Sequence, residues 1–351
     1  MKRFTSIVMA ACAVLIGVAS VVPALPAAAQ GSASLSIVPK KNYTIEPGKS
    51  VSDKLTIRNL DSQAPLILSL RLVDFSFNDD TGTPKLMLAE DAPQTTWSLK
   101  PFLTLPQTVT VPPKESKTVD MGVSIPEGQG AGSYYSAIVY SSGASEGGNV
   151  GLSASGVTLV FASVPGTVNE NLQLEKFGAY FPSANGKEAY YTKVTVDQPQ
   201  LIAYTLKNNG NVTESPVGSI TVKNMFGKEQ VIEDVNPNGS LALIGQSRTF
   251  TSCFKKKSQD VNFNGSRTEA TACATPDLWP GYYTASLNLF YGQNGNRTQE
   301  ITGSTSFWYL PMWSIVILIV LLLILAYFAW RISRFVRRMR GKVAQKKSAR
   351  K

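Results

Sequence analysis

The sequence has 351 residues, of which 34 are basic, 24 are acidic and none is histidine, for a formal net charge of +10. Because the sequence contains no histidine, Ser-His-Asp and Cys-His catalytic sites, histidine zinc sites and a histidine general base are all excluded. The positive charge is concentrated in two segments without acidic residues: 331–351 has ten basic side chains and 1–29 has two. The rest of the chain has 22 basic and 24 acidic residues, so its charge does not indicate nucleic-acid binding.

Residues 1–29 have the pattern of a secretory signal peptide. Lys2 and Arg3 precede an apolar run over 7–22, and Ala27-Ala28-Ala29 supplies an A-x-A cleavage pattern. We therefore expect the mature chain to begin near residue 30 and to be exported. Cys12 leaves lipoprotein processing as an alternative, although the residues before it match that cleavage motif poorly.

The exported segment, 31–306, predicts an all-β fold. Apolar and polar residues alternate over 66–72, 119–125, 202–207 and 285–291, as in strands that are buried on one face and wet on the other. Turn residues separate these runs about every ten residues. Examples are Pro47-Gly48, Pro112-Pro113, Asn209-Gly210 and Asn294-Gly295. Many short strands with regular turns are typical of antiparallel sandwiches.

Two halves of this segment repeat the same motifs. Residues 132–137 (GSYYSA) and 281–285 (GYYTA) each begin a late strand, and 55–59 (LTIRN) has a counterpart in 204–208 (YTLKN). A tyrosine just after a glycine at the start of a late strand is where immunoglobulin-like sandwiches place a corner tyrosine, whose hydroxyl bonds to upstream backbone. We interpret these tyrosines as core residues with a satisfied hydroxyl, and the corner role is the alternative. We predict two tandem immunoglobulin-like β-sandwiches, 31–167 and 168–306, joined near 166–171.

Two polar segments are candidates for a binding or metal site. The Gly- and Ser-rich stretch 141–156 is either a flexible hairpin loop or a lip over a binding surface. Asp74 and Asn78-Asp79-Asp80, followed by Gly82, only loosely resemble a calcium loop, and we interpret them as turn residues. No catalytic, cofactor-binding or metal site is predicted. Five Asn-x-Ser/Thr triplets would accept glycans only in a eukaryotic secretory pathway. They are Asn42, Asn211, Asn238, Asn264 and Asn296.

The exported segment contains two cysteines, Cys253 and Cys273, both in the second predicted domain. Disulfides persist outside the cell, so a Cys253–Cys273 bond is expected, with two free thiols as the alternative. Such a bond would close a loop of about 20 residues and stabilise the fold by about 3 kcal/mol in the chain-entropy model. The enclosed polar segment is predicted to be a surface insertion, either a solvated hairpin or a recognition loop.

Residues 311–330 predict a transmembrane helix. The run from Trp313 to Trp330 carries no charge and matches the thickness of a bilayer. Aromatic residues that suit headgroup depth flank it: Trp308, Tyr309 and Trp313 at one end, and Tyr327, Phe328 and Trp330 at the other. The basic tail, 331–351, predicts a cytoplasmic end close to anionic inner-leaflet lipids. A buried helix of a soluble protein is the alternative for the span, and a regulatory or partner-docking role is the alternative for the tail.

The first half resembles the first extracellular domain of bacterial WxL-interacting surface proteins. The resemblance rests on 35–39 (LSIVP), 45–50 (IEPGKS), 73–75 (VDF), 111–113 (VPP) and the motif GSYY at 132–135. The order of signal peptide, two β-domains, helix and basic tail is similar as well. The resemblance implies that the first domain associates with peptidoglycan and the second with a protein partner or host matrix. The cysteine pair departs from that pattern, so the second domain's partner stays open.

These observations together predict a non-catalytic, single-pass protein of the bacterial cell membrane. Its ectodomain would lie outside the cell and bind cell-wall polymer or another surface protein, in part through strand edges that can accept an added strand. An accessory subunit of a membrane complex is one alternative, and an exported hydrolase is another. The span favours a simple anchor over an accessory subunit because its polar residues, Ser314 and Tyr327, lie near its ends.

Overall fold

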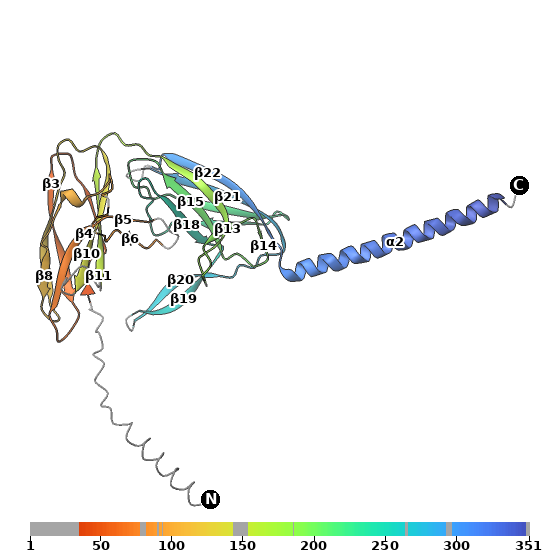
Figure 1. The fold of residues 1–351 in the computed structure, drawn as a ribbon, viewed down its shortest axis with the longest axis horizontal. Coiled ribbons are helices and arrows are strands. Elements are labelled where there is room, and N and C mark those ends of the chain that lie inside the picture. Colours follow the sequence, from red (N-terminus) through yellow and green to blue (C-terminus); the bar gives the residue numbers. More distant parts are fainter. Residues whose placement is uncertain are drawn as a thin grey trace, which may run out of the picture.

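The computed structural model describes residues 35–77, 82–89, 91–92, 94–142, 154–184, 186–263, 266–292 and 297–348. The predicted signal peptide with Cys12, the polar residues Asn78-Asp79-Asp80 and most of 141–156 lie outside these ranges. The described chain forms two β-sandwiches side by side, a hairpin that projects from the second one, and a long helix that leaves the second sandwich at the end away from the first (Figure 1). The fold class predicted from the alternation, an all-β ectodomain with a C-terminal helix, is confirmed.

The first sandwich packs a four-stranded sheet on a five-stranded one. The smaller sheet has the order β1 (Leu35–Ser36), β3 (Ser50–Asn59), β9 (Ser116–Ser124), β7 (Leu103–Thr104). The larger sheet has the order β2 (Lys40–Thr44), β11 (Ala154–Val164), β10 (Gly132–Ser142), β4 (Leu66–Val73), β8 (Thr108–Val111). A short excursion after β4 contains the paired strands β5 (Phe75–Ser76) and β6 (Lys85–Leu86), and the 3₁₀ turn η1 (Lys100–Phe102) precedes β7.

The second sandwich repeats this plan. Its smaller sheet has the order β13 (Tyr190–Thr192), β12 (Leu172–Phe181), β15 (Leu201–Asn208), β18 (Ser247–Cys253). Its larger sheet has the order β14 (Val194–Thr195), β22 (Gln299–Tyr309), β21 (Gly281–Tyr291), β16 (Val217–Asn224), β17 (Glu229–Glu233). In both larger sheets a short strand pairs in parallel with the last strand of the domain, β2 with β11 and β14 with β22, whereas the other described pairs are antiparallel. The shared topology explains the repeated motifs.

Each repeated motif makes the same hydrogen bonds in both sandwiches. The hydroxyl of Tyr134 donates to the carbonyl of Gly130 at 2.8 Å, and that of Tyr283 donates to the carbonyl of Trp279 at 2.8 Å. Both bonds reach back four residues, as those of corner tyrosines do, so the structure supports the alternative role for Tyr134 and Tyr283, which are also buried in their cores. The buried side chains of Asn59 and Asn208, each at the end of a strand, bond to backbone on either side of the following turn. These contacts position the turns at the ends of the two sandwiches.

The predicted alternation is confirmed in several strands and wrong in one. Leu66, Leu68 and Leu70 are buried, as are the apolar residues of 119–125. In β15, however, Ala203 and Thr205 are also buried, although their face was expected to be wet. Thr205 lies against Tyr191 and Thr249, with hydroxyl separations of 2.7 and 2.9 Å. The side chains of Tyr191 and Thr249 therefore help to cover this face of β15, which is shielded from solvent.

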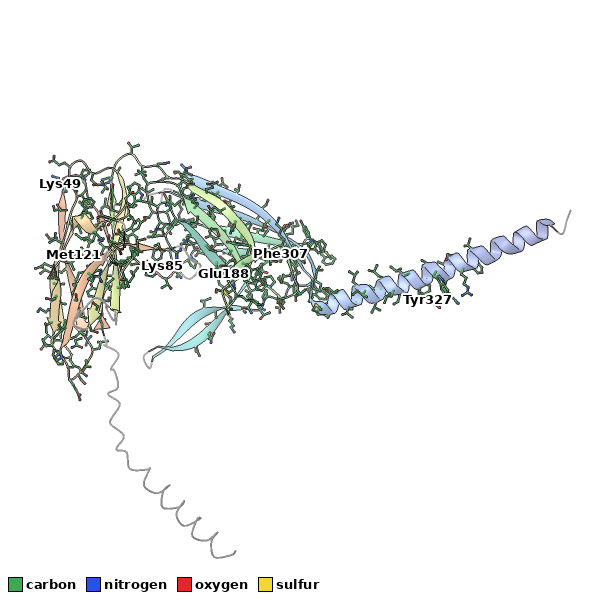
Figure 2. All side chains as sticks on the ribbon, in the orientation of Figure 1. Lys49, Lys85, Met121, Glu188, Phe307 and Tyr327 are labelled. Atoms are coloured by element: carbon green, nitrogen blue, oxygen red, sulfur yellow. A yellow bond between two sulfur atoms is a disulfide. The ribbon has the colours of Figure 1, made fainter. Side chains whose placement is uncertain are left out.

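The second sandwich extends farther than the sequence suggested. Strand β22 continues to Tyr309, three residues beyond the expected boundary at 306. Phe307 and Tyr309 are buried in the second core, at 1% and 8% exposure, and Figure 2 shows Phe307 inside this domain. Tyr309 is therefore a core residue and not part of the predicted headgroup-level ring, because its side chain is on the inward face of β22.

The C-terminal helix α2 (Met312–Ser348) stands apart from both sandwiches (Figure 1). The most apolar 18-residue window of its segment Met312–Val336 has a mean hydropathy of 2.8, and none of that window is buried. Its side chains project freely, as Tyr327 does in Figure 2, so it is not a core helix of the described fold. It is long and apolar enough to cross a bilayer. Its orientation in a membrane stays a prediction.

Candidate functional site

The two sandwiches meet through an apolar cluster on the outer face of β10. Tyr135, Ala137 and Val139 of β10 are buried there against Phe75 of the excursion and Ile244 of the second domain. The whole cluster consists of Val73, Phe75, Phe77, Tyr135, Ala137, Val139, Phe161, Leu243 and Ile244. The ring centroid of Phe75 lies 5.4 Å from that of Tyr135 and 5.9 Å from that of Phe161. Burial of such aromatic surface holds the sandwiches as one body.

Backbone contacts fix the register of this interface. The amide of Ser133 donates to the carbonyl of Asn211 at 3.0 Å, and the side chain of Asn211 donates to the carbonyl of Ala131 at 3.0 Å. The amide of Thr213 donates to the hydroxyl of Ser133 at 3.0 Å. Gly132, at φ +149°, permits this approach, because a Cβ there would lie 2.5 Å from the carbonyl oxygen of Asn211. The same glycine that begins β10 therefore also allows the second domain to dock.

A buried carboxylate organises the excursion that lies under the second domain. Asp74 is 4% exposed and accepts hydrogen bonds from the hydroxyls of Ser98 and Ser136 at 2.7 and 3.1 Å and from the amide of Thr95 at 3.1 Å. Asp74 is therefore a core anchor and not the turn residue that was expected. Asn78, Asp79 and Asp80 lie outside the described ranges. Among the described residues, no group of three or more acidic or cysteine side chains is placed to hold a metal.

A polar cleft of about 640 Å³ lies between the sandwiches. One wall is Lys40, Asn42, Tyr43 and Thr44 of β2, with Phe161 to Ser163 of β11 beside them. The other wall comes from loops of the second domain and carries Thr213, Glu214, Ser215, Asp234, Asn236, Pro237, Gly239, Leu241, Gly292 and Arg297. Most of these lining groups are hydroxyls, amides and backbone, with charges of both signs. Such a lining suits a ligand that offers many hydrogen-bonding groups.

Strand β2 is a free edge of the larger sheet in the first sandwich. Its parallel pairing with β11 is bounded by bonds at both ends: the amide of Leu159 donates to the carbonyl of Pro39 at 2.9 Å, and the amide of Ile45 donates to that of Ser163 at 3.0 Å. Residues alternate along a strand, so Lys41 and Tyr43 face β11 with their backbone groups, and those of Lys40, Asn42 and Thr44 point away from it. An unpaired row of this kind is a template for another strand.

Side chains also brace β2 from behind. The hydroxyl of Tyr43 donates to the carboxylate of Asp53 at 2.5 Å, and the ammonium group of Lys41 lies 2.8 Å from the same oxygen. The hydrogen bonds from Lys41 and Tyr43 lower the pKa of Asp53 to about 2. The carboxylate therefore stays charged and holds the edge strand in place, which leaves β2 pre-organised.

Glu214 is the most unusual titratable group of the cleft. It is 2% exposed, and one oxygen accepts a hydrogen bond from the amide of Gly292 at 3.2 Å while the other, Oε1, has no hydrogen-bond partner among the described residues. Burial, followed by the charge of Glu170, raises the pKa of Glu214 to about 7. Sequence analysis did not identify Glu214 as a candidate, because a single glutamate in a turn belongs to no recognisable motif.

The cysteines are joined in the structure. Cys253 at the end of β18 is bonded to Cys273, with 5.2 Å between their Cα atoms. The enclosed segment forms the hairpin of β19 (Lys255–Phe263) and β20 (Ser266–Ala274), which projects away from the sandwich (Figure 1). The disulfide therefore attaches the base of this insertion to the smaller sheet, as the sequence predicted. It lies at the other end of β18 from the loop that docks on the first domain.

Comparison with known proteins does not assign this chain to a family. No protein-family model and no curated protein matches the chain. Among solved structures, the class 5 fimbriae chaperone CfaA has 13% identity and a TM-score of 0.32, covering 80% of this chain and 100% of its own. A chain from a chaperone–tip adhesin complex of CFA/I fimbriae has 13% identity and a TM-score of 0.35 with the same coverage, and the E. coli chaperone DraB has 12% identity, a TM-score of 0.30 and coverage of 79% and 97%. By the strand order and register described above, the part of the chain before α2 is a tandem pair of immunoglobulin-like β-sandwiches.

Proposed function

We propose that this chain is a non-catalytic, membrane-anchored cell-envelope protein that binds an extended segment of another surface protein along β2. The observation that carries the proposal is a free sheet edge that lies in the wall of a cleft between two sandwiches packed as one body. A partner strand placed there would hydrogen-bond to β2 on one side and meet the polar wall of the second domain on the other.

The anchor supports this proposal. Helix α2 offers an exposed apolar surface, and the only described polar groups within 313–330 are those of Ser314, Tyr327 and the two tryptophans. The hydroxyl of Ser314 bonds within the chain to the carbonyl of Pro311 at 2.7 Å. Such a helix suits a single-pass anchor, with the ectodomain outside and the basic tail in the cytoplasm beside anionic lipids.

A second candidate ligand is cell-wall polymer. The lining of the cleft favours it, because amides and hydroxyls such as those of Asn42, Asn236 and Thr213 suit a glycan as well as a peptide backbone. The resemblance of the first domain to WxL-interacting proteins points to the same ligand class. The two candidates share the cleft, so one experiment can distinguish them.

The test uses the full chain in cells that make it natively. A photo-crosslinking amino acid replaces Lys40, which is exposed in the wall of the cleft, and the attached molecule is identified by mass spectrometry. A matched probe replaces Thr110 in β8, an exposed position on the opposite edge of the same sheet. We expect a protein adduct from the first position and none from the second.

Asn42→Pro tests whether strand addition is responsible. Proline removes the outward amide of Asn42 and blocks an incoming strand, while the bonds of β2 to β11 use other residues. Asn42→Ala is the control, because it removes the side chain and any glycan but keeps the amide. We expect capture to fall by at least about fivefold with proline, since a lost hydrogen bond alone is worth about 1 kcal/mol, and to be kept with alanine. Equal capture by both variants, or no adduct at Lys40, would contradict the proposal; a glycan adduct would support the second candidate.

A further inference from the structure

One end of the second sandwich presents apolar side chains to solvent. Four strands of its larger sheet meet at this end: β22 and β14 finish at Tyr309 and Thr195, β21 starts at Gly281, and β16 finishes at Asn224. Exposed apolar residues follow or precede these strand ends. We name them the rim: Val194, Val196, Met225, Phe226, Trp279 and Trp308.

The rim side chains are strongly exposed yet their backbone is well held. Phe226 and Trp279 are 74% and 72% exposed. The amide of Phe226 donates to the side-chain oxygen of Asn224 at 3.0 Å, and the carbonyl of Trp279 accepts the corner bond from Tyr283. The ring of Trp308 lies 5.2 Å from that of Tyr282. Turns that are fixed in this way present large apolar groups in a defined place, which is unusual for a surface exposed to water.

The rim lies beside the outer end of the predicted span. Only Leu310 and Pro311 separate β22 from α2, and two residues reach at most about 7 Å. The amide of Leu310 donates to the carbonyl of Thr195 at 2.8 Å, so this short connection is itself attached to β14. Figure 1 shows α2 leaving the sandwich at the end marked by β14, away from the first domain. A membrane crossed by α2 must therefore come close to the rim.

We infer that the rim rests in the headgroup layer of the lipid bilayer and sets the tilt of the ectodomain. Trp and Phe side chains favour this depth, where their apolar surface leaves water while polar neighbours stay hydrated. Contacts from three turns spaced across a sheet restrain rotation about the span in a way that a single helix cannot. The rim is separate from the cleft, so this inference does not depend on the proposed ligand.

The experiment measures the depth of the rim with the full chain in nanodiscs of phosphatidylcholine and phosphatidylglycerol. Lys228→Cys, an exposed position in the turn after Phe226, carries an NBD fluorophore in a Cys12→Ser background with the Cys253–Cys273 bond left oxidised. Lipids with a doxyl group near the headgroup act as the quencher. The control label is at Asn238→Cys, exposed in the loop at the end of the second sandwich that faces the cleft.

We expect strong quenching and a blue-shifted emission at the Lys228→Cys label and little of either at Asn238→Cys. Replacing Phe226 and Trp279 together with serine should abolish the quenching. Both side chains are mostly exposed, so the double variant should still fold, and an unchanged circular dichroism spectrum checks this. An unquenched Lys228→Cys label would overturn the inference. Quenching that the double substitution leaves intact would overturn it too, because the span alone would then set the depth.

Discussion

The equivalent strands β10 and β21 differ in the face that they turn away from their own core. In β21 the outward residues Tyr282, Thr284 and Ser286 are partly or fully exposed, as expected for an outer sheet. In β10 every residue from Gly132 to Ser141 is buried. The difference comes from Tyr135, Ala137 and Val139, which provide the apolar surface that the excursion after β4 and the loop before β18 cover.

The loops that follow the equivalent residues Asn59 and Asn208 differ in length. Six residues separate Asn59 from the start of β4, whereas eight separate Asn208 from the start of β16. The longer loop contains Asn211 and Thr213, which bond to the first domain, and Glu214, which faces the cleft. The comparison therefore shows how one repeated sandwich plan gains a partner surface: an apolar outer face in one copy and a longer loop in the other.

The largest expected effect comes from placing a charge in the interface. Ile244 is 6% exposed, and Ile244→Asp would bury an unpaired carboxylate among Phe75 and Tyr135. We expect a loss of roughly 3 kcal/mol or more in docking free energy, with each sandwich still folded on its own core. Calorimetry should then resolve two transitions, and protease should cut the linker between β11 and β12.

The matched control is Val231→Asp on β17, where the native side chain is 53% exposed. It adds the same charge to the same domain and should leave one cooperative transition and a resistant linker. A single transition in Ile244→Asp, at the wild-type temperature, would show that the interface does not couple the sandwiches.

An intermediate effect is expected from the repeated asparagines. Asn59→Ala and Asn208→Ala each remove three hydrogen bonds from a buried side chain, so each should cost about 2–4 kcal/mol in the free energy of unfolding. Hydrogen exchange should increase mainly in the sandwich that carries the substitution. Asn209→Ala, next in the chain and exposed, should change little. Strongly unequal costs would argue against equivalent roles in the two copies.

The smallest expected effect is a pH dependence specific to the second sandwich. Burial raises the pKa of Glu214 from 4.5 to about 7, so its neutral form is favoured in the folded state. The stabilisation is fully present below about pH 4.5 and is lost as the pH rises through about 7. The melting temperature should fall more between pH 5 and 8 in the wild type than in Glu214→Gln, which stays neutral. Parallel curves for the two proteins would refute this assignment.

Local patterns predicted much of the fold. The alternation over 66–72 and 119–125 identified strands, and the Gly-x-Tyr starts identified core tyrosines with the corner role as an alternative, because period-two burial and turn chemistry depend on near neighbours. The separation of Cys253 and Cys273 similarly predicted a pinned insertion. The burial of Tyr309 was missed, since an aromatic residue near a span has the same sequence pattern at the end of a core strand.

The cleft could not be predicted in the same way. The free edge of β2 depends on its parallel pairing with β11, more than a hundred residues later. The docking of Leu243 and Ile244 depends on which outer face lies opposite them in the folded chain. A signal was present in the apolar run over 241–244 and in the missing alternation of 134–140, which together mark two surfaces that need covering.

The direct passage of β22 into α2 has a mechanical consequence. In the proposed membrane-anchored arrangement, a pull on the two sandwiches away from the bilayer would act along β22, whose eleven residue pairs with β21 run from Gly281↔Tyr309 to Tyr291↔Gln299. Force in the direction of the strand would load these pairs together in shear, so they would not open one after another. The last strand of the fold would then act as a tether that resists traction on the second sandwich.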